Sequence, residues 1–259
     1  MKRLYIIKAG TTFPATEKQF GDFDQWTAAT LGITDVEIDI VDAENGATLP
    51  SVQECAGVVI TGSHFMVTDN LPWSVKLEEW VLSLLHTGIP LFGICYGHQL
   101  LAQAAGGQVG FHPHGEEIGT VEVELLPDCV NDPVFQSLPQ SFLVHVTHEQ
   151  TVLRLPTGAI RLAANTYEPN HAFRLRGWAW GVQFHPEYST DILRSNIREQ
   201  KDELEAAGRS GRESGRLFPK SHGWTSSSSH GRSGPGGHSF LAGCMAELMK
   251  YRIQSRDIP

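Results

Sequence analysis

The sequence predicts an α/β protein with a mostly parallel central sheet, helices on both faces of that sheet, and a small mixed or antiparallel portion. Strand-like apolar runs recur in the first half with helical segments between them, at residues 3–7, 36–41, 57–61 and 90–94. This alternation is typical of a parallel sheet covered by helices. Shorter β-like pieces fill residues 118–184, which predicts that the sheet gains antiparallel strands there.

The first strand leads into a long loop, residues 8–26, at the sheet edge where ligands of α/β proteins collect. Thr11, Thr12, Asp22 and Asp24 stand in this loop. They either shape a specificity or docking surface or serve turns and helix caps, and we favour the second interpretation.

The helix after the third strand has the clearest pattern. Asp69 or Asn70 is expected to cap it, Pro72 suits its first turn, and Gly88 is expected to end it. Its apolar residues recur at helical spacing and are therefore expected in the core: Trp73, Leu77, Trp80, Val81, Leu84 and Leu85.

The later elements are shorter. The β-like pieces of the second half lie at residues 120–126, 141–146, 159–164 and 178–184, and a polar helix is expected at about 189–207.

The domain organisation follows from a change in composition after this helix. Residues 1–207 carry a net charge of −14 and form the predicted globular domain, whereas residues 208–259 carry +5. Residues 208–239 are dominated by Gly, Ser and Arg, and such a segment buries too little apolar surface to offset its ordering entropy. We expect a flexible segment there, followed by a tail with one short helix at 240–259. A sharper hypothesis is that residues 208–239 are a translated frameshift, which an uninterrupted original reading frame in the gene would refute.

Charge and composition exclude several classes of protein. A net charge of −9 argues against a nucleic-acid partner, because binding to phosphates uses clustered Lys and Arg. No apolar run approaches the roughly 20 residues that span a bilayer, and the N-terminal apolar stretch is too short for a secretory signal. The four cysteines form no CxxC pair, so disulfides and zinc sites have little support. We expect a cytoplasmic protein with a small-molecule substrate, no membrane partner, no metal and no cofactor.

One histidine-rich motif contains residue types that bind metal ions. His112, His114, Glu116 and Glu117 lie close together in FHPHGEEIG. The interspersed Pro and Gly favour a solvated loop over the fixed geometry that metal ligands need.

The motif that carries chemistry is PLFGICYGHQ, residues 90–99. An apolar strand runs into Gly93, Cys95 and Gly97, and a helix of about 97–105 follows. Glycines on both sides of the cysteine allow a tight turn, and the following helix directs the positive end of its dipole at the sulfur. This is the strand-turn-helix context of a nucleophile elbow, so Cys95 is predicted to be a nucleophile rather than a packed thiol.

A thiolate nucleophile needs a base, and WAWGVQFHPEYS, residues 178–189, supplies one. His185 ends a strand, and Glu187 lies two positions later, on the same side of an extended chain. Cys95, His185 and Glu187 would then act as nucleophile, base and orienting carboxylate. The oxyanion of an acyl transfer would be held by the backbone amides of Tyr96 and Gly62, with Ser63 as a further donor.

These motifs together resemble the class I glutamine amidotransferases, the triad family that includes the glutaminase domain of GMP synthase. The resemblance covers about residues 2–200 and implies a flavodoxin-like fold. It also implies that Cys95 attacks the side-chain amide of glutamine to give a glutamyl thioester and ammonia, and that His185 handles the protons. By motif position Gln99 would contact the substrate. The stretch VTHEQTV resembles the family loop that holds the α-amino and α-carboxylate groups, so Thr147, His148 and Glu149 are further candidates.

The sequence departs from the family in two ways. Many relatives begin the oxyanion loop with Gly-Gly-Pro, whereas this chain has Thr61, Gly62, Ser63 and His64. It also carries no synthetase signature and no Walker-type GxxxxGK motif.

Three functions remain open at this point. The first is a free-standing glutaminase that hands ammonia to a separate synthetase subunit. The second is a γ-glutamyl peptidase or hydrolase that uses the same triad on small γ-glutamyl compounds. The third is an inactive binding or regulatory module, which the intact Cys, His and Glu argue against.

Overall fold

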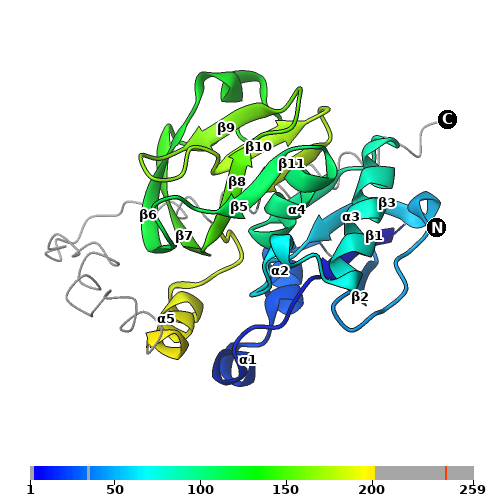
Figure 1. Cartoon of the computed structure of the whole chain (residues 1–259), viewed down its shortest axis with the longest axis horizontal. Helices are drawn as coiled ribbons and strands as arrows, with labels where there is room; N and C mark the ends of the chain where they lie inside the picture. The colour runs from blue at the N-terminus through cyan, green and yellow to red at the C-terminus, as the bar shows by residue number, and fades with distance from the viewer. Residues whose placement is uncertain (1–2, 34–35, 202–242, 244–259) are drawn as a thin grey trace, which may run out of the picture.

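The computed structural model describes residues 3–33, 36–201 and 243 (Figure 1). A nine-stranded sheet in the order β2-β1-β3-β4-β11-β10-β9-β6-β7 forms its centre, beside a two-stranded sheet of β5 and β8. The strands are β1 (Arg3–Lys8), β2 (Ile38–Asp42), β3 (Cys55–Ile60), β4 (Leu91–Ile94), β5 (Gln108–Phe111), β6 (Glu117–Leu125), β7 (Ser141–His148), β8 (Gln150–Arg154), β9 (Ile160–Ala164), β10 (Ala172–Leu175) and β11 (Ala179–Val182). The helices are α1 (Pro14–Phe20), α2 (Phe23–Leu31), α3 (Pro72–Leu85), α4 (Tyr96–Ala104) and α5 (Thr190–Glu199).

Five adjacent strands, β2, β1, β3, β4 and β11, are parallel. The chain runs from β1 to β2 on one side and then to β3 on the other, so the direction of winding switches at β1. In such sheets ligands bind beyond the carboxyl ends of the strands near that switch. The predicted parallel sheet is confirmed, and its carboxyl edge is where a site is expected.

Helices cover both faces of the parallel strands, as the sequence predicted. Side chains of β1 alternate between two apolar clusters, because successive residues of a strand point to opposite faces. Leu4 packs in the cluster that includes Leu31 of α2. Tyr5 packs in the other, with Leu77 of α3 and Leu100 of α4. Each fully buried aliphatic side chain stabilises the fold by roughly 1.5–3 kcal/mol.

The other half of the sheet is antiparallel and more extensive than the short β-like pieces indicated (Figure 1, green). β6 and β7 pair along their length, from Glu117 opposite His148 to Glu124 opposite Ser141. Strand β10 was not predicted, since its four residues, AFRL, are too few to show a period. It fills the place between β9 and β11 and so joins the two halves.

Two helix starts differ in how they are capped. Neither Asp69 nor Asn70 caps α3, whose N-cap is Leu71 with no side-chain hydrogen bond, so that expectation was wrong. Asn70 instead adopts a left-handed conformation (φ 50°) that closes a short 3-10 turn, and Pro72 then starts the helix. In the 8–26 segment, which contains α1, Asp22 caps α2 by accepting from the Phe23 amide at 2.8 Å, which confirms the capping interpretation for this residue.

Helix α5 follows the predicted site directly. Ser189 caps it by accepting a hydrogen bond from the Ile192 amide at 3.2 Å. The described residues end at 201, apart from Gly243. They therefore do not include the end of the helix predicted at 189–207, the flexible segment predicted at 208–239 or, except for Gly243, the tail predicted at 240–259. The boundary at residue 207 therefore stays a prediction. Within the described part of the chain, no helix has the length and apolar character needed to cross a membrane.

Candidate active site

The ends of three neighbouring parallel strands bring the predicted residues together. Strands β3, β4 and β11 lie side by side, and each continues into one part of the site. Gly62 comes two residues after β3, Cys95 directly after β4, and His185 three residues after β11. The Cys95 amide donates to the carbonyl oxygen of Val182 at 2.8 Å, which ties the start of the turn to β11.

Cys95 lies at a strained corner between β4 and α4. Its backbone has φ 48° and ψ −97°, a conformation that side chains other than glycine rarely adopt. A Cβ on Gly97 would lie 2.6 Å from the carbonyl oxygen of Ile60, and one on Gly93 would collide with the carbonyl of Gly97. Both glycines are therefore required for this turn. The corner leaves the sulfur at the N-terminus of α4, where the helix dipole stabilises negative charge.

His185 is held by a carboxylate on one side. Its Nδ1 lies 2.7 Å from Oε1 of Glu187, and both side chains are buried. Because a carboxylate accepts, Nδ1 carries the hydrogen and Nε2 is the nitrogen left for Cys95. Burial disfavours the charged imidazolium, yet the negative charges of Glu187 and Cys95 outweigh it and raise the pKa of His185 to about 10. His185 therefore carries a proton at neutral pH.

Aromatic rings and a backbone bond fix the plane of this imidazole. The ring of Tyr188 stacks on it with centroids 4.0 Å apart, and Phe23 of α2 lies parallel to it at 6.3 Å. The His185 amide donates to the carbonyl of His145 at 2.8 Å. The histidine cannot turn away from Cys95 without disturbing this packing.

The loop after β3 lies against the same imidazole. A Cβ on Gly62 would lie 2.8 Å from Cε1 of His185, so only glycine fits. The loop is anchored where Oγ1 of Thr61 accepts from the Ala9 amide at 3.0 Å. Tyr96 opens α4 directly after Cys95, and its side chain is buried with the hydroxyl paired to Ser74. Of the two predicted oxyanion residues, Gly62 thus lies against the His185 ring and Tyr96 directly follows Cys95 in the chain.

Comparison with known proteins places this geometry in a family. The family model described as "Glutamine amidotransferase class-I" matches residues 20–201. The chain belongs to the class I glutamine amidotransferase family.

Two curated relatives differ in how much of their length is matched. A GMP synthase (glutamine-hydrolysing) of Aeropyrum pernix is 40% identical over 153 residues, which are 57% of this chain and 28% of that protein. Gamma-glutamyl peptidase 4 of Arabidopsis thaliana is 27% identical over 197 residues, 74% of this chain and 78% of that protein. The chain therefore spans only about a quarter of the length of the GMP synthases that it matches.

Solved structures confirm the fold of this chain. A glutamine amidotransferase from Thermotoga maritima superimposes with a TM-score of 0.70 at 23% identity, over 98% of this chain and 99% of that one. One from Methylobacillus flagellatus gives 0.71 at 20% identity, over 98% and 95%. At identities this low the superpositions establish the architecture alone. That architecture agrees with the flavodoxin-like α/β fold expected from the resemblance.

The departure from the Gly-Gly-Pro loop places His64 near the predicted catalytic histidine, His185. Its ring lies 4.1 Å from the ring of Phe13 and 5.8 Å from that of Phe23. Loss of water around the imidazole and the positive charge of His185 lower the pKa of His64, although the residue keeps an exposed side. His64 is therefore neutral at pH 7 and adds a flat, weakly polar surface at the mouth of the site.

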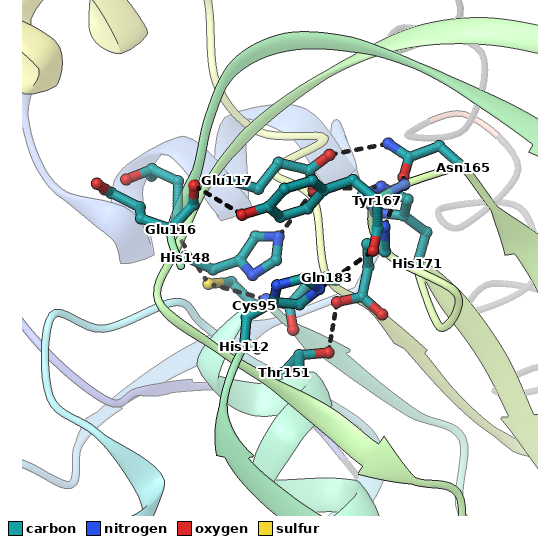
Figure 2. A network of polar contacts seen from close by, with 12 residues as sticks. Cys95, His112, Glu116, Glu117, His148, Thr151, Asn165, Tyr167, His171 and Gln183 are labelled. Carbon is teal, nitrogen blue, oxygen red and sulfur yellow. Dashed lines mark hydrogen bonds and ion pairs between the residues drawn. The ribbon is translucent and has the colours of Figure 1, made fainter. Parts of the chain in front are cut away.

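The predicted substrate-binding residues separate into two groups. Gln99 is buried on α4, and its Nε2 donates to the carbonyl of Gln150 at 2.7 Å. The carbonyl oxygen of Thr147 is 3.8 Å from Sγ of Cys95. The ring of His148 instead contacts Glu117, as Figure 2 shows. The side chain of Glu149 is exposed.

Gln183 was not predicted as a site residue, yet its Nε2 donates to Sγ of Cys95 at 3.5 Å (Figure 2). The signal was present, because Gln183 lies two positions before His185 at a strand end and so points to the same side. Tyr188 and Phe23 gave no such signal, since aromatic residues are common in cores.

The histidine-rich motif after β5 forms no metal site in the described part of the chain, where no group of three or more His, Cys, Asp or Glu side chains could hold an ion. His112 stacks on Tyr167 with ring centroids 4.4 Å apart. The hydroxyl of Tyr167 donates to the carbonyl of His114 at 2.7 Å. The predicted solvated loop is confirmed for residues 113–115, which are exposed, whereas His112 and Glu117 at its two ends are buried.

Proposed function

We propose that this protein hydrolyses the side-chain amide of glutamine to glutamate and ammonia through a thioester on Cys95. The observation that carries the proposal is the arrangement at three adjacent strand ends. A cysteine on a strained turn faces a histidine that is bonded to a buried carboxylate at 2.7 Å, with a glycine loop packed on the same histidine. Membership of the amidotransferase family supports this reading.

The proposed reaction begins with the proton already on His185. The Cys95 thiolate attacks the amide carbon of glutamine, and the backbone amides of Gly62 and Tyr96 stabilise the oxyanion that forms. His185 then protonates the leaving nitrogen, so ammonia departs and a glutamyl thioester remains. Water, activated by the now neutral His185, releases glutamate. Glu187 holds the ring in position and stabilises its charged form.

We propose that the small-molecule substrate meets Gln99 and the backbone around Thr147. Gln99 lies one helical turn beyond Cys95 on α4, and the Thr147 carbonyl lies beside the sulfur. His148 and Glu149 would contribute through the backbone of the same loop. The acceptor chemistry for the ammonia belongs to a separate synthetase subunit in this proposal, by analogy with the GMP synthases, of which this chain matches 28% or less.

A second candidate function is cleavage of a γ-glutamyl bond in a small peptide or conjugate. The match to the gamma-glutamyl peptidases extends over 76–78% of those proteins, in contrast to the partial match with the GMP synthases. His64 and Phe13 also form a surface at the mouth of the site on which a leaving group larger than ammonia could rest. The catalytic steps are the same, with an amine in place of ammonia.

Trapping with an electrophilic glutamine analogue tests the shared chemistry. The analogue is incubated with the full chain, and the modified peptide is located by mass spectrometry. Label on Cys95, blocked by excess glutamine and absent from Cys95→Ala, supports the proposal. Label on Cys55 or Cys129, or no label on a folded sample, refutes it.

Turnover assays then separate the two functions. A glutaminase releases ammonia from free glutamine with a higher kcat/KM than it shows for γ-glutamyl dipeptides. The reverse preference assigns the chain to peptide cleavage. The variant His64→Pro, which moves the loop toward the family pattern, is expected to reduce turnover of dipeptides more than turnover of glutamine.

A further inference from the structure

We infer that Gln183 is a catalytic residue that stabilises the Cys95 thiolate through its amide N–H, and that a hydrogen-bond relay from the backbone of Gln150 through Gln99 fixes its orientation. The inference rests on the proposed role of Cys95 as nucleophile. Three contacts define the relay: Gln150 carbonyl to Gln99, Gln99 to Gln183, and Gln183 to the sulfur.

The direction of the relay follows from the first contact. A backbone carbonyl only accepts, so the group of Gln99 that lies 2.7 Å from the Gln150 oxygen must be its NH₂. The second hydrogen of the same nitrogen points to Oε1 of Gln183 at 3.1 Å. With its oxygen committed to Gln99, the amide of Gln183 directs its own NH₂ at Sγ of Cys95, 3.5 Å away. A reversed Gln183 would place its NH₂ group against the NH₂ group of Gln99, so that two donors would face each other.

The start of the relay is itself held firmly. The Gln150 carbonyl also accepts from Nδ1 of His148 at 3.0 Å. Nε2 of His148 lies 3.0 Å from Oε2 of Glu117, as Figure 2 shows. His148 thus bridges the carbonyl of Gln150 and the carboxylate of Glu117, and all three residues are buried. These contacts hold in place the acceptor that orients the two glutamines.

The contact between Gln183 and the sulfur of Cys95 is shielded from water. Gln183 is completely buried, and Cys95 and Gln99 are only 5% and 4% exposed. The backbone of Gln183 is fixed as well, because its amide donates to the carbonyl of His171 at 2.8 Å. In such surroundings an N–H aimed at a thiolate acts with little competition from water. Gln183 and His185, two positions apart on one strand end, thus stabilise the same sulfur from different directions.

The test measures the reactivity of Cys95 directly, by its alkylation with iodoacetamide, because the thiolate is the reacting form. In Gln183→Glu, one oxygen still accepts from Gln99 and the other places negative charge beside the sulfur. We expect the alkylation rate at pH 6.5 to fall about tenfold or more, while the rate at pH 9.5 stays within about twofold of the unmodified protein. Gln183→Met removes the donor without adding charge, and its alkylation rate at pH 6.5 is expected to be about fivefold lower than that of the unmodified protein.

Two further variants make the result decisive. Gln19→Glu makes the same amide-to-carboxylate change at an exposed position of α1 and should leave the alkylation rate unchanged. Gln99→Met leaves Gln183 in place but frees it to rotate, and about a threefold fall at pH 6.5 is expected even if the position-183 variants do not fold. Unchanged rates at pH 6.5 in folded Gln183→Met and Gln99→Met would overturn the inference.

Alkylation requires no turnover of glutamine, so this readout is separate from the proposed function. A protein that hydrolyses glutamine while its Gln183 variants alkylate normally would contradict only the role of Gln183. A protein that shows the expected alkylation rates but cleaves neither glutamine nor γ-glutamyl peptides would contradict only the proposed substrate.

Discussion

Two buried histidine-carboxylate pairs lie in the two halves of the sheet, and their surroundings give them different roles, one catalytic and one structural. At the parallel edge, His185 bonds Glu187 through Nδ1 at 2.7 Å, which leaves its other nitrogen for Cys95. On the antiparallel ribbon, His148 bonds Glu117 through Nε2 at 3.0 Å and the Gln150 carbonyl through Nδ1. The first ring has a nitrogen for proton transfer, and the second has both committed to structure. The role of a buried histidine is therefore decided by its second nitrogen.

The two pairs also contribute to stability in different pH ranges. Burial alone would raise the pKa of Glu117, but hydrogen bonds from His148 and His171 and their positive charges hold it well below its usual value. Its contribution to stability is therefore present above about pH 4.5 and lost as the pH falls further. The raised pKa of His185 acts in the opposite range: its stabilisation is complete below about pH 6.5 and is lost as the pH rises toward 10.

The largest expected effect comes from exchanging each histidine for glutamine. His185→Gln removes the acid and base and should lower kcat for the preferred substrate by about 10³-fold or more. His148→Gln should keep kcat within about tenfold, because its ring does not reach the reacting atoms. Steady-state kinetics of the two variants measure this, and equal losses in kcat would remove the proposed difference between the pairs.

The next effect is on stability. Glu117→Gln removes the buried carboxylate that both His148 and His171 contact, and it should lower the free energy of unfolding by about 3 kcal/mol at pH 7. Because the native protein loses this contribution in acid, the gap between the two proteins should narrow below about pH 4.5. Urea unfolding at pH 7 and pH 4 provides the measurement, and a gap that is equal at both pH values would contradict the assignment.

A third buried histidine sharpens the comparison because it packs against an aromatic ring rather than a carboxylate. His98 on α4 is fully buried beside Phe173, and burial lowers its pKa to about 3. Below about pH 6.5 the unfolded chain binds a proton that the folded protein does not, so stability should decline on acidification, by about 2 kcal/mol at pH 5. His98→Gln should flatten this part of the stability profile in thermal or urea unfolding between pH 5 and 7. An unchanged slope would show that His98 does not titrate in this way.

The smallest expected effect concerns the helix that follows the catalytic pair. Ser189→Ala removes the side-chain cap of α5 and should lower the free energy of unfolding by about 1 kcal/mol. Ser83→Ala on α3 is the matched control, since that exposed hydroxyl only contacts the carbonyl of Glu79 in its own helix. The control should change stability by less than about 0.5 kcal/mol. Equal losses in both variants would argue against a specific cap.

Local patterns predicted the parallel half of the fold and the residues gathered at its edge. Apolar runs identified β1 and β4, and the glycines around Cys95 indicated the sharp corner, because each depends on neighbours in sequence. The capping of α3 was wrong because Asn70 could adopt the left-handed conformation instead. The relay from Gln150 through Gln99 to Gln183 joins β8, α4 and the segment after β11. The spacing of Gln183 from His185 indicates that it points toward the site, but the contacts between the three glutamines depend on the folded arrangement.

The most direct test of the central claim is a search for the acyl intermediate itself. The full chain is mixed with glutamine or a γ-glutamyl dipeptide, quenched in acid during turnover, and digested for peptide mass spectrometry. The arrangement of Cys95, His185 and Glu187 predicts a glutamyl group on the peptide that contains Cys95, and its absence in Cys95→Ser. Turnover by a folded protein with the glutamyl group on Cys55 or Cys129, or with no acylated peptide at any quench time, would contradict it.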